Sequence, residues 1–219
     1  MKIKGAIFDF DGTLFDSMKI WDTAGEKYLE TLGIRIDYNL HDITKDLSMK
    51  QTACYLKDKF SLDLSHEDII SGVNTIVEKF YLYEALPKNG VVSFLERLKK
   101  EGASMCVATV TEHRLIKAAL DRFDMTRFFD DIVTCEEVGH GKDEPMIYEE
   151  AMRRLKTGYD DTMVFEDALY AIRTAHNAGF TTTGIFDQSE KMQNELKMHC
   201  DYFINDYRHT EVFWNSVLS

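Results

Sequence analysis

The sequence has few of the features that mark disordered or disulfide-stabilised chains. It contains only two prolines in 219 residues, no low-complexity tract, and no segment that repeats at a fixed period. Because 44% of its residues are hydrophobic, the whole chain is expected to fold and to bury a core. Its four cysteines lie far apart and form no Cys-x-x-Cys pair. We therefore expect reduced core thiols in a cytoplasmic protein.

Long apolar runs and an excess of positive charge are also missing. No apolar segment approaches the roughly 18 residues of a membrane-spanning helix, and no charged-then-apolar leader precedes the first predicted strand. We therefore expect neither export nor membrane insertion. Acidic residues outnumber basic ones by 38 to 26, which gives a net charge of -12. This charge repels polyanions, and without a basic patch we expect no nucleic acid partner. A small anionic ligand can still bind where a metal or a lysine acts locally.

The alternation of apolar runs with helical patterns predicts an α/β fold. Four apolar runs lack strict alternation of apolar and polar residues and are followed by helical patterns, as expected of buried parallel strands. They are residues 3–10, 103–110, 161–167 and 181–186, with shorter candidates at 130–137 and 200–205. The pattern indicates a doubly wound, mainly parallel sheet with helices between its strands. One such helix is expected within residues 91–102, where a basic last turn precedes Gly102.

Residues 17–85 differ from the rest of the chain, because they contain three helical patterns and no convincing strand. The apolar residues of these patterns are spaced as on one face of a helix. The patterns cover residues 20–32, 49–60 and 69–80. Ser65 and Asp68 resemble a capping box with Asp in place of the usual Glu. We therefore predict an α/β core domain of residues 1–16 and 86–219, with an all-helical domain of residues 17–85 inserted after the first strand.

Acidic and hydroxyl side chains stand at the carboxyl ends of the predicted strands, where open α/β sheets bind their ligands. Asp9 and Asp11 follow the first strand, Thr109 ends another, and Glu166 and Asp167 end a third. A buried carboxylate is costly unless a cation or hydrogen bonds compensate it, so something positive should lie beside Asp9. A hard, oxygen-ligated ion such as Mg²⁺ suits this cluster. The pair at the third strand could instead cap the next helix, but two acids at a buried strand end favour metal binding.

A loop lysine and the start of a helix could together bind a phosphoryl group. Lys142 lies in a loop between a predicted strand and a helix, where it could clamp phosphate or remain a solvated surface residue. The backbone amides after Thr109, beginning with that of Val110, precede a helix that is expected to start near Thr111. A helix dipole favours anions at that end. Thr109 could also be an ordinary β-branched strand residue.

Four segments, taken in order, resemble the four motifs of the haloacid dehalogenase (HAD) superfamily. They are DFDGTLFDS from Asp9, the strand-end Thr109, GKxxP at residues 141–145, and VFEDALYAIRTAHNAGF at residues 164–180. Any single motif would be weak evidence, but the ordered set is specific. The resemblance covers the chain from end to end. The predicted helical insertion is similar to the helical cap, of the type called C1, in the beta-phosphoglucomutase-like and phosphoglycolate-phosphatase-like branch.

The resemblance implies a role for each of these residues. Asp9 would attack phosphorus and form an aspartyl-phosphate, and Asp11 would act as general acid and base. The Asp9 carboxylate, the main-chain carbonyl of Asp11 and Asp167 would bind Mg²⁺, with Glu166 either as a further ligand or as a support for the ligands. The strand-end threonine and the loop lysine would hold the phosphoryl oxygens.

The resemblance predicts a phosphoric monoester hydrolase for a small phosphorylated metabolite, acting as a monomer or weak homo-oligomer. Asp11 separates activities within the superfamily, because dehalogenases lack an acid there and transport ATPases carry threonine. The nearest rival function is a sugar phosphomutase with the same nucleophile. A receiver-type phospho-signalling module also combines acids, a strand-end hydroxyl, a lysine and Mg²⁺. The inserted helices and Asp11 count against that second rival.

Two residues of the predicted cap bear on the choice between phosphatase and mutase. Lys45 falls near a position where the resembling mutases carry arginine, and Trp21 falls where they carry histidine. Lysine cannot reproduce the planar two-point grip of arginine on phosphate, so both departures favour a phosphatase. Lys45 could instead be a solvated helix residue, and Trp21 a core residue or the wall of a cleft. In the motifs, Ala168 and Ala171 replace the usual serine and glycine, and Asp143 replaces a common proline.

Overall fold

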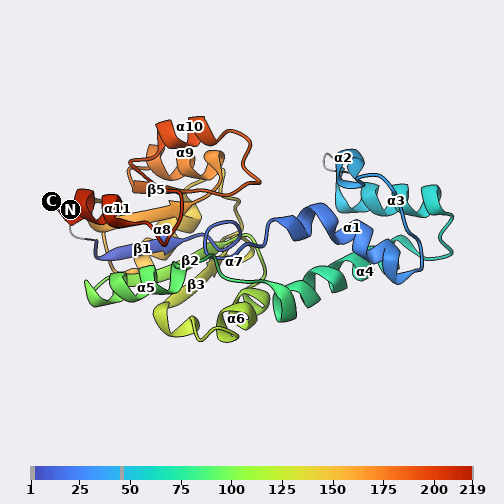
Figure 1. Ribbon diagram of the computed structural model, residues 1–219, viewed down its shortest axis with the longest axis horizontal. Coiled ribbons are helices and arrows are strands. Elements are labelled where there is room, and N and C mark those ends of the chain that lie inside the picture. The colour runs from blue at the N-terminus through green and yellow to red at the C-terminus, as the bar shows by residue number, and fades with distance from the viewer. Residues whose placement is uncertain (1–2, 45–46, 219) are drawn as a thin grey trace. The chain divides into compact units, whose positions relative to one another are not determined.

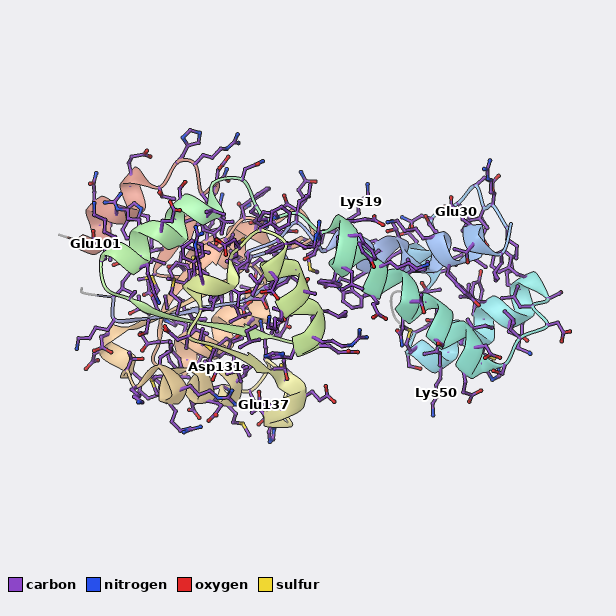
Figure 2. The ribbon with its side chains drawn as sticks, turned by 90° about the horizontal axis from the view of Figure 1, so that it is seen from below. Lys19, Glu30, Lys50, Glu101, Asp131 and Glu137 are labelled. Atoms are coloured by element: carbon purple, nitrogen blue, oxygen red, sulfur yellow. The ribbon has the colours of Figure 1, made fainter. Side chains whose placement is uncertain are left out.

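The computed structural model describes residues 3–44 and 47–218, and the chain divides into two compact units. The α/β unit consists of Met1–Asp16 and Ala85–Ser219, and the helical unit consists of Ser17–Glu84. Exposed charged side chains, such as Lys50 of the helical unit and Glu101 of the α/β unit, point outward (Figure 2). Within the described residues, no helix has both the length and the apolar character that crossing a membrane requires.

A six-stranded parallel sheet forms the centre of the α/β unit (Figure 1). Its strand order is β3-β2-β1-β4-β5-β6, and all neighbouring strands are parallel. The strands are β1 (Gly5–Phe8), β2 (Ser104–Thr109), β3 (Asp131–Thr134), β4 (Thr162–Glu166), β5 (Thr181–Ile185) and β6 (Tyr202–Ile204). Each lies within a predicted apolar run but is shorter than it. The predicted doubly wound α/β fold is confirmed.

Successive strand residues point to opposite faces of the sheet, and helices cover both faces. On one face, Ile7 and Val164 belong to a buried cluster with side chains of α8 and α9. On the other, the rings of Phe8 and Phe165 stack at 4.2 Å, and both lie edge-on to Phe94 of α5. The helices are α5 (Val91–Lys100), α6 (His113–Asp121), α7 (Cys135–Val138), α8 (Met146–Leu155), α9 (Leu169–Asn177), α10 (Gln193–His199) and α11 (Glu211–Leu218), with 3₁₀ turns η2 (Thr126–Phe128) and η3 (Tyr159–Asp161).

The helical unit contains the three predicted helices and two short segments that the sequence patterns do not indicate. Its elements are α1 (Lys19–Thr31), α2 (His41–Thr44), α3 (Met49–Phe60), α4 (His66–Lys79) and a π-helical turn, η1 (Phe80–Glu84). The predicted capping box starts α4, because Ser65 Oγ accepts from Asp68 N at 3.0 Å and Asp68 Oδ2 accepts from Ser65 N at 3.2 Å. Gly72 lets α4 approach α1 closely, since a Cβ atom there would lie 2.1 Å from a ring carbon of Tyr28.

Two expectations about burial are wrong. Cys106 lies in the core, but Cys54 is exposed, because the buried face of α3 is formed by its neighbours Ala53 and Leu56. Cys135 and Cys200, the other two thiols, are partly exposed. The interpretation of Trp21 as a core residue also fails. Its side chain is 45% exposed, because the buried face of α1 runs through the adjacent Ile20 and its helical neighbours.

Candidate active site

Asp9 and Glu166 lie side by side because their strands are hydrogen-bonded neighbours in register. β1 pairs with β4 so that Phe8 lies opposite Phe165, and the backbone amide of Asp9 donates to the carbonyl of Phe165 at 2.9 Å. The strand order also reverses at β1 and β4. In doubly wound sheets, ligands bind outside the carboxyl ends of the strands at such a switch point. The register therefore places two acids where a ligand is expected.

A tight turn after β1 carries Asp11 and Thr13. Phe15 N donates to Phe10 O at 3.0 Å, and Gly12 N donates to Phe15 O at 2.9 Å. Gly12 has a φ of 77°, which lies in the left-handed region that favours glycine. The turn therefore depends on glycine at this position, as the motif suggests.

Three buried carboxylates and one buried ammonium group form the centre of the site. One oxygen each of Asp9, Glu166 and Asp167 lies within 4.8 Å of the other two, and these residues are only 6%, 1% and 5% exposed. Lys142 is 3% exposed, and its Nζ donates to Glu166 Oε1 at 2.7 Å and to Asp9 Oδ1. These four residues are among those that the sequence predicts for the site, and the structure brings them together.

Burial and repulsion by neighbouring acids disfavour the charged forms of Asp9 and Asp167. Burial, reinforced by the charges of Glu166 and Asp11 and opposed by Lys142, raises the pKa of Asp9 to about 8. Burial together with the neighbouring acids also raises the pKa of Asp167 well above its usual value. Burial alone would lower the pKa of Lys142, but the carboxylates of Asp9 and Glu166 outweigh it, so this pKa lies above its ordinary value. One lysine is therefore not enough to keep all the acids of the cluster ionised.

The donor set of the cluster fits a hard divalent cation. When all groups are ionised, the three carboxylates and the ammonium group leave two net negative charges, which one divalent ion would neutralise. Carboxylate oxygens are the ligands that Mg²⁺ prefers. Asp9, Glu166 and Asp167 come from two adjacent strand ends, and one oxygen of each lies within 4.8 Å of the other two. These residues therefore fit Mg²⁺ by charge, by ligand type and by mutual distance.

Two hydroxyl groups that the sequence analysis missed support these acids. Tyr148 in α8 is fully buried, and its hydroxyl donates to Glu166 Oε1 at 2.7 Å. Thr13 Oγ1 donates to Asp167 Oδ1 at 3.2 Å. Thr13 stands within the first motif and could have been noted there, whereas Tyr148 is signalled only by its place one helical turn after GKxxP. Because Glu166 Oε1 accepts from both Tyr148 and Lys142, it holds the lysine in place beside the other acids.

Asp11 and Thr109 are joined through Thr111. The amide of Thr111 donates to Thr109 Oγ1 at 3.1 Å, and its hydroxyl donates to Asp11 Oδ2 at 2.7 Å. α6 begins at His113 with Glu112 as its N-cap, near the predicted start, and the chain forms a bend at Thr111 ahead of the helix. Val110, whose amide is the predicted phosphate donor, lies in this bend with its side chain 63% exposed.

The structure does not test the predicted roles of the two cap residues, Trp21 and Lys45. Trp21 belongs to the helical unit, and Lys45 lies outside the described residues, so the predictions for both remain predictions.

Two residues that depart from the usual motifs have clear surroundings in the structure. Asp143 is exposed next to the buried Lys142. Ala168 precedes α9 without a side-chain cap, and the amide of the next residue instead donates to Glu190 Oε2 at 2.9 Å. A distant carboxylate therefore replaces the missing serine at this helix start.

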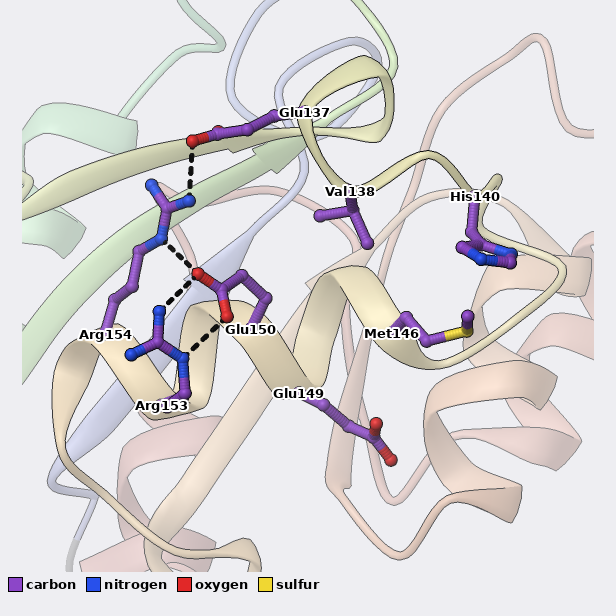
Figure 3. A pocket seen from close by; sticks show the side chains of 8 residues that line it. All are labelled: Glu137, Val138, His140, Met146, Glu149, Glu150, Arg153 and Arg154. Atoms are coloured by element: carbon purple, nitrogen blue, oxygen red, sulfur yellow. Dashed lines mark hydrogen bonds and ion pairs between the residues drawn. The ribbon is translucent and has the colours of Figure 1, made fainter.

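A cavity of about 470 Å³ lies elsewhere on the α/β unit, beside α7 and α8 (Figure 3). Its lining residues are Glu137, Val138, His140, Met146, Glu149, Glu150, Arg153 and Arg154. Arg153 and Arg154 both pair with Glu150, and Arg154 also pairs with Glu137, so the cations in this cavity already have partners. The cavity includes none of the buried acids and is separate from the candidate active site.

Comparison with known proteins gives several relatives of this chain. The Phosphorylated carbohydrates phosphatase of Thermotoga maritima is 28% identical over 154 residues, which are 70% of this chain and 71% of that protein. The Phosphoglycolate phosphatase of Aquifex aeolicus is 32% identical over 146 residues, 64% of each chain. Among solved structures, a beta-phosphoglucomutase-like protein of Thermotoga maritima has a TM-score of 0.85 at 23% identity, covering 97% of this chain and 99% of that one.

The family model of haloacid dehalogenase-like hydrolases matches residues 6–185, which include all four motifs. The match runs from β1 through the helical unit to β5. The chain therefore belongs to the family of haloacid dehalogenase-like hydrolases.

Proposed function

We propose that this protein is a Mg²⁺-dependent phosphatase that hydrolyses a small phosphorylated metabolite through an aspartyl-phosphate. The observation that carries the proposal is the meeting of Asp9, Glu166 and Asp167 with Lys142 at the carboxyl edge of the sheet. The names of the relatives give further support, because they are phosphatases of phosphorylated carbohydrates and of phosphoglycolate.

Asp9 is the proposed nucleophile. A carboxylate oxygen forms a bond to phosphorus while the bond from phosphorus to the leaving oxygen breaks, which splits one difficult displacement into two steps. Asp11, two residues further on, donates a proton to the leaving oxygen. It then removes a proton from the water that hydrolyses the aspartyl-phosphate. The hydrogen bond from Thr111 to Asp11 orients that carboxyl group between the two steps.

The remaining groups are proposed to bind Mg²⁺ and the phosphoryl group and to neutralise the negative charge of its oxygens. Asp9, the carbonyl of Asp11, Asp167 and Glu166 are the proposed ligands of Mg²⁺, which when bound supplies positive charge that the phosphoryl oxygens need. Lys142 adds a second positive charge, held in place by Glu166. Thr109 and the amide of Val110 are the proposed hydrogen-bond donors to the phosphoryl oxygens. The helical unit is the proposed cap that excludes bulk water and selects the leaving group.

The substitution Asp9→Asn tests the proposed nucleophile. With p-nitrophenyl phosphate and Mg²⁺, turnover should fall at least about a thousandfold, because an amide is a poor nucleophile towards phosphorus. Asp161→Asn is the matched control, since Asp161 pairs with Lys4 at the surface at 2.7 Å. Undiminished turnover of the Asp9 variant would refute the assignment. Turnover that persists in EDTA would refute the metal dependence.

Product analysis separates the phosphatase from the mutase alternative. A hexose 6-phosphate that yields inorganic phosphate and free sugar indicates hydrolysis, whereas an isomeric sugar phosphate indicates phosphoryl return. Trp21 and Lys45, at positions where resembling mutases carry other residues, favour hydrolysis. A stable phosphorylated Asp9 with negligible turnover would instead indicate a signalling module.

A further inference from the structure

The two segments that connect the α/β unit to the helical unit run side by side as a short ribbon. Asp16 is the last residue before the helical unit, and Ala85 is the first residue after it. Asp16 N donates to Leu86 O at 3.0 Å, Lys88 N donates to Leu14 O at 2.8 Å, and the bridge between them is antiparallel. Any change in the direction of one segment must therefore be shared by the other.

The side chain of Lys88 fastens this ribbon to the carboxyl edge of the sheet. Its Nζ donates to Asp187 Oδ2 at 2.7 Å and to Phe186 O at 3.0 Å, both immediately after β5, and pairs with Asp16 Oδ1 at 3.3 Å. The Lys88 side chain is 12% exposed, and that of Asp187 is 11% exposed. Lysine and aspartate are rarely buried unless they are paired, so this contact is an internal one.

Asp187 is itself held in the orientation that meets Lys88. Its second oxygen, Oδ1, accepts from Ser189 N at 2.9 Å and from Ser189 Oγ at 2.7 Å. Each carboxylate oxygen of Asp187 therefore has its own partner, and the side chain cannot turn without losing one set of bonds. A flexible ion pair at the surface would not need the two hydrogen bonds from Ser189 to hold its carboxylate in place.

We infer that Lys88 is a positioning residue that fixes the direction in which both connecting segments leave the α/β unit. This inference rests on the proposed function, in which the helical unit selects the leaving group. The ribbon begins at the turn that carries Asp11, so it links the proposed acid and the helical unit to one anchored point. Lys88 touches none of the proposed reacting atoms and acts through the ribbon.

Three variants of the full-length protein test the inference. Lys88→Met removes the charge at similar length, and Lys88→Arg keeps the charge and can still reach Asp187. Lys99→Met is the matched control, because Lys99 also binds a carboxylate and a backbone carbonyl, Asp130 at 3.5 Å and Phe128 at 3.4 Å, but is 44% exposed, and neither of these contacts involves the ribbon.

Hydrogen exchange is the measurement that does not depend on activity. Peptides covering residues 14–18 and 84–89 should exchange faster in Lys88→Met than in the unsubstituted protein, because the ribbon is no longer anchored. Lys88→Arg and Lys99→Met should match the unsubstituted protein. Equal exchange in Lys88→Met would overturn the inference, even if that variant were less stable.

Kinetics with two probes give the second readout. For glucose 6-phosphate, Lys88→Met should lower kcat/KM about tenfold or more while acetyl phosphate, with its small leaving group, changes less than about twofold, since misplacement costs most where positioning matters. Equal losses for both probes would indicate a merely structural role and would overturn the inference. If the unsubstituted protein hydrolyses neither of these probes nor p-nitrophenyl phosphate, the proposed function fails, and the exchange experiment alone decides the role of Lys88.

Discussion

Replacing Lys142 with methionine should destabilise the α/β unit strongly. Its ammonium group lies between Asp9 and Glu166, and all three residues are less than a tenth exposed. Removing one partner of a buried ion pair leaves an uncompensated charge, at a cost of about 3–5 kcal/mol. Protonation of Asp9, whose pKa is already raised to about 8, relieves part of this cost at low pH. The loss should therefore be larger at pH 9 than at pH 6.

The two tryptophans allow the stability of each unit to be followed separately. Trp214 is 2% exposed in α11 of the α/β unit, whereas Trp21 belongs to the helical unit. Urea unfolding in EDTA, in a Trp21→Phe background, then reports the α/β unit through Trp214 fluorescence. With an m-value of about 2 kcal/mol/M, Lys142→Met should lower the urea midpoint by about 1.5–2.5 M. Lys99→Met, at an exposed pair, should stay within about 0.5 kcal/mol.

A double-mutant cycle identifies the partner. If Lys142 and Glu166 stabilise the fold through each other, then Lys142→Met combined with Glu166→Gln should cost less than the sum of the single substitutions, by about 1 kcal/mol or more. A Lys142→Met variant within about 0.5 kcal/mol of the unsubstituted protein in EDTA would refute the reasoning, because the acids would then be balanced without this lysine.

Three further predictions concern the same cluster. In EDTA, the free energy of unfolding should fall as the pH rises from about 4 to 8. Asp9 has a pKa of about 8 in the folded protein against 3.8 in the unfolded chain, so the folded protein keeps a proton that the unfolded chain releases. Asp9→Asn should make this dependence on pH weaker, and urea midpoints that do not change with pH would contradict the prediction. Mg²⁺ at 100 times its Kd should add about 2.7 kcal/mol of stability, with a smaller shift in Asp167→Asn; equal thermal shifts in both proteins would count against the metal site. Tyr148→Phe should cost about 1.5–3 kcal/mol in urea unfolding through its lost bond to Glu166, whereas the exposed Tyr170→Phe should have little effect, and equal midpoints would disprove the role of Tyr148.

The fold could be predicted well from the sequence because its signals are local. The run through Ile7 and Phe8 is apolar without alternation, as a strand covered on both faces must be, and the structure buries both residues completely. The boundaries were less accurate. Cys135 falls within a predicted strand but begins α7, because the hydroxyl of Thr134 accepts from Glu137 N and caps a helix there.

The site was predictable where an acid interrupts a buried strand and unpredictable where burial depends on distant partners. Asp9 directly follows fully buried apolar residues, which marks it within the sequence itself. No buried apolar run directly precedes Tyr148 or Lys88 in the sequence to indicate their roles. Their hydrogen-bond partners are Glu166, 18 residues away, and Asp187, 99 residues away. Both partners stand at the carboxyl ends of β4 and β5, which pair in parallel, so these contacts depend on the tertiary structure.

Lys142 is buried and Lys88 is partly buried, and the two lysines face different amounts of negative charge. Lys142 meets a group of three almost fully buried acids, which carry more negative charge than one lysine balances when all are ionised, and the pKa values of Asp9 and Asp167 are raised. Lys88 meets one buried acid, Asp187, and the 59% exposed Asp16, whose charge water can screen. The second group is therefore balanced without another ion. We therefore expect that adding or removing Mg²⁺ changes the surroundings of Lys142 more than those of the anchored ribbon at Lys88, although the charge of Asp187 does act on Asp167.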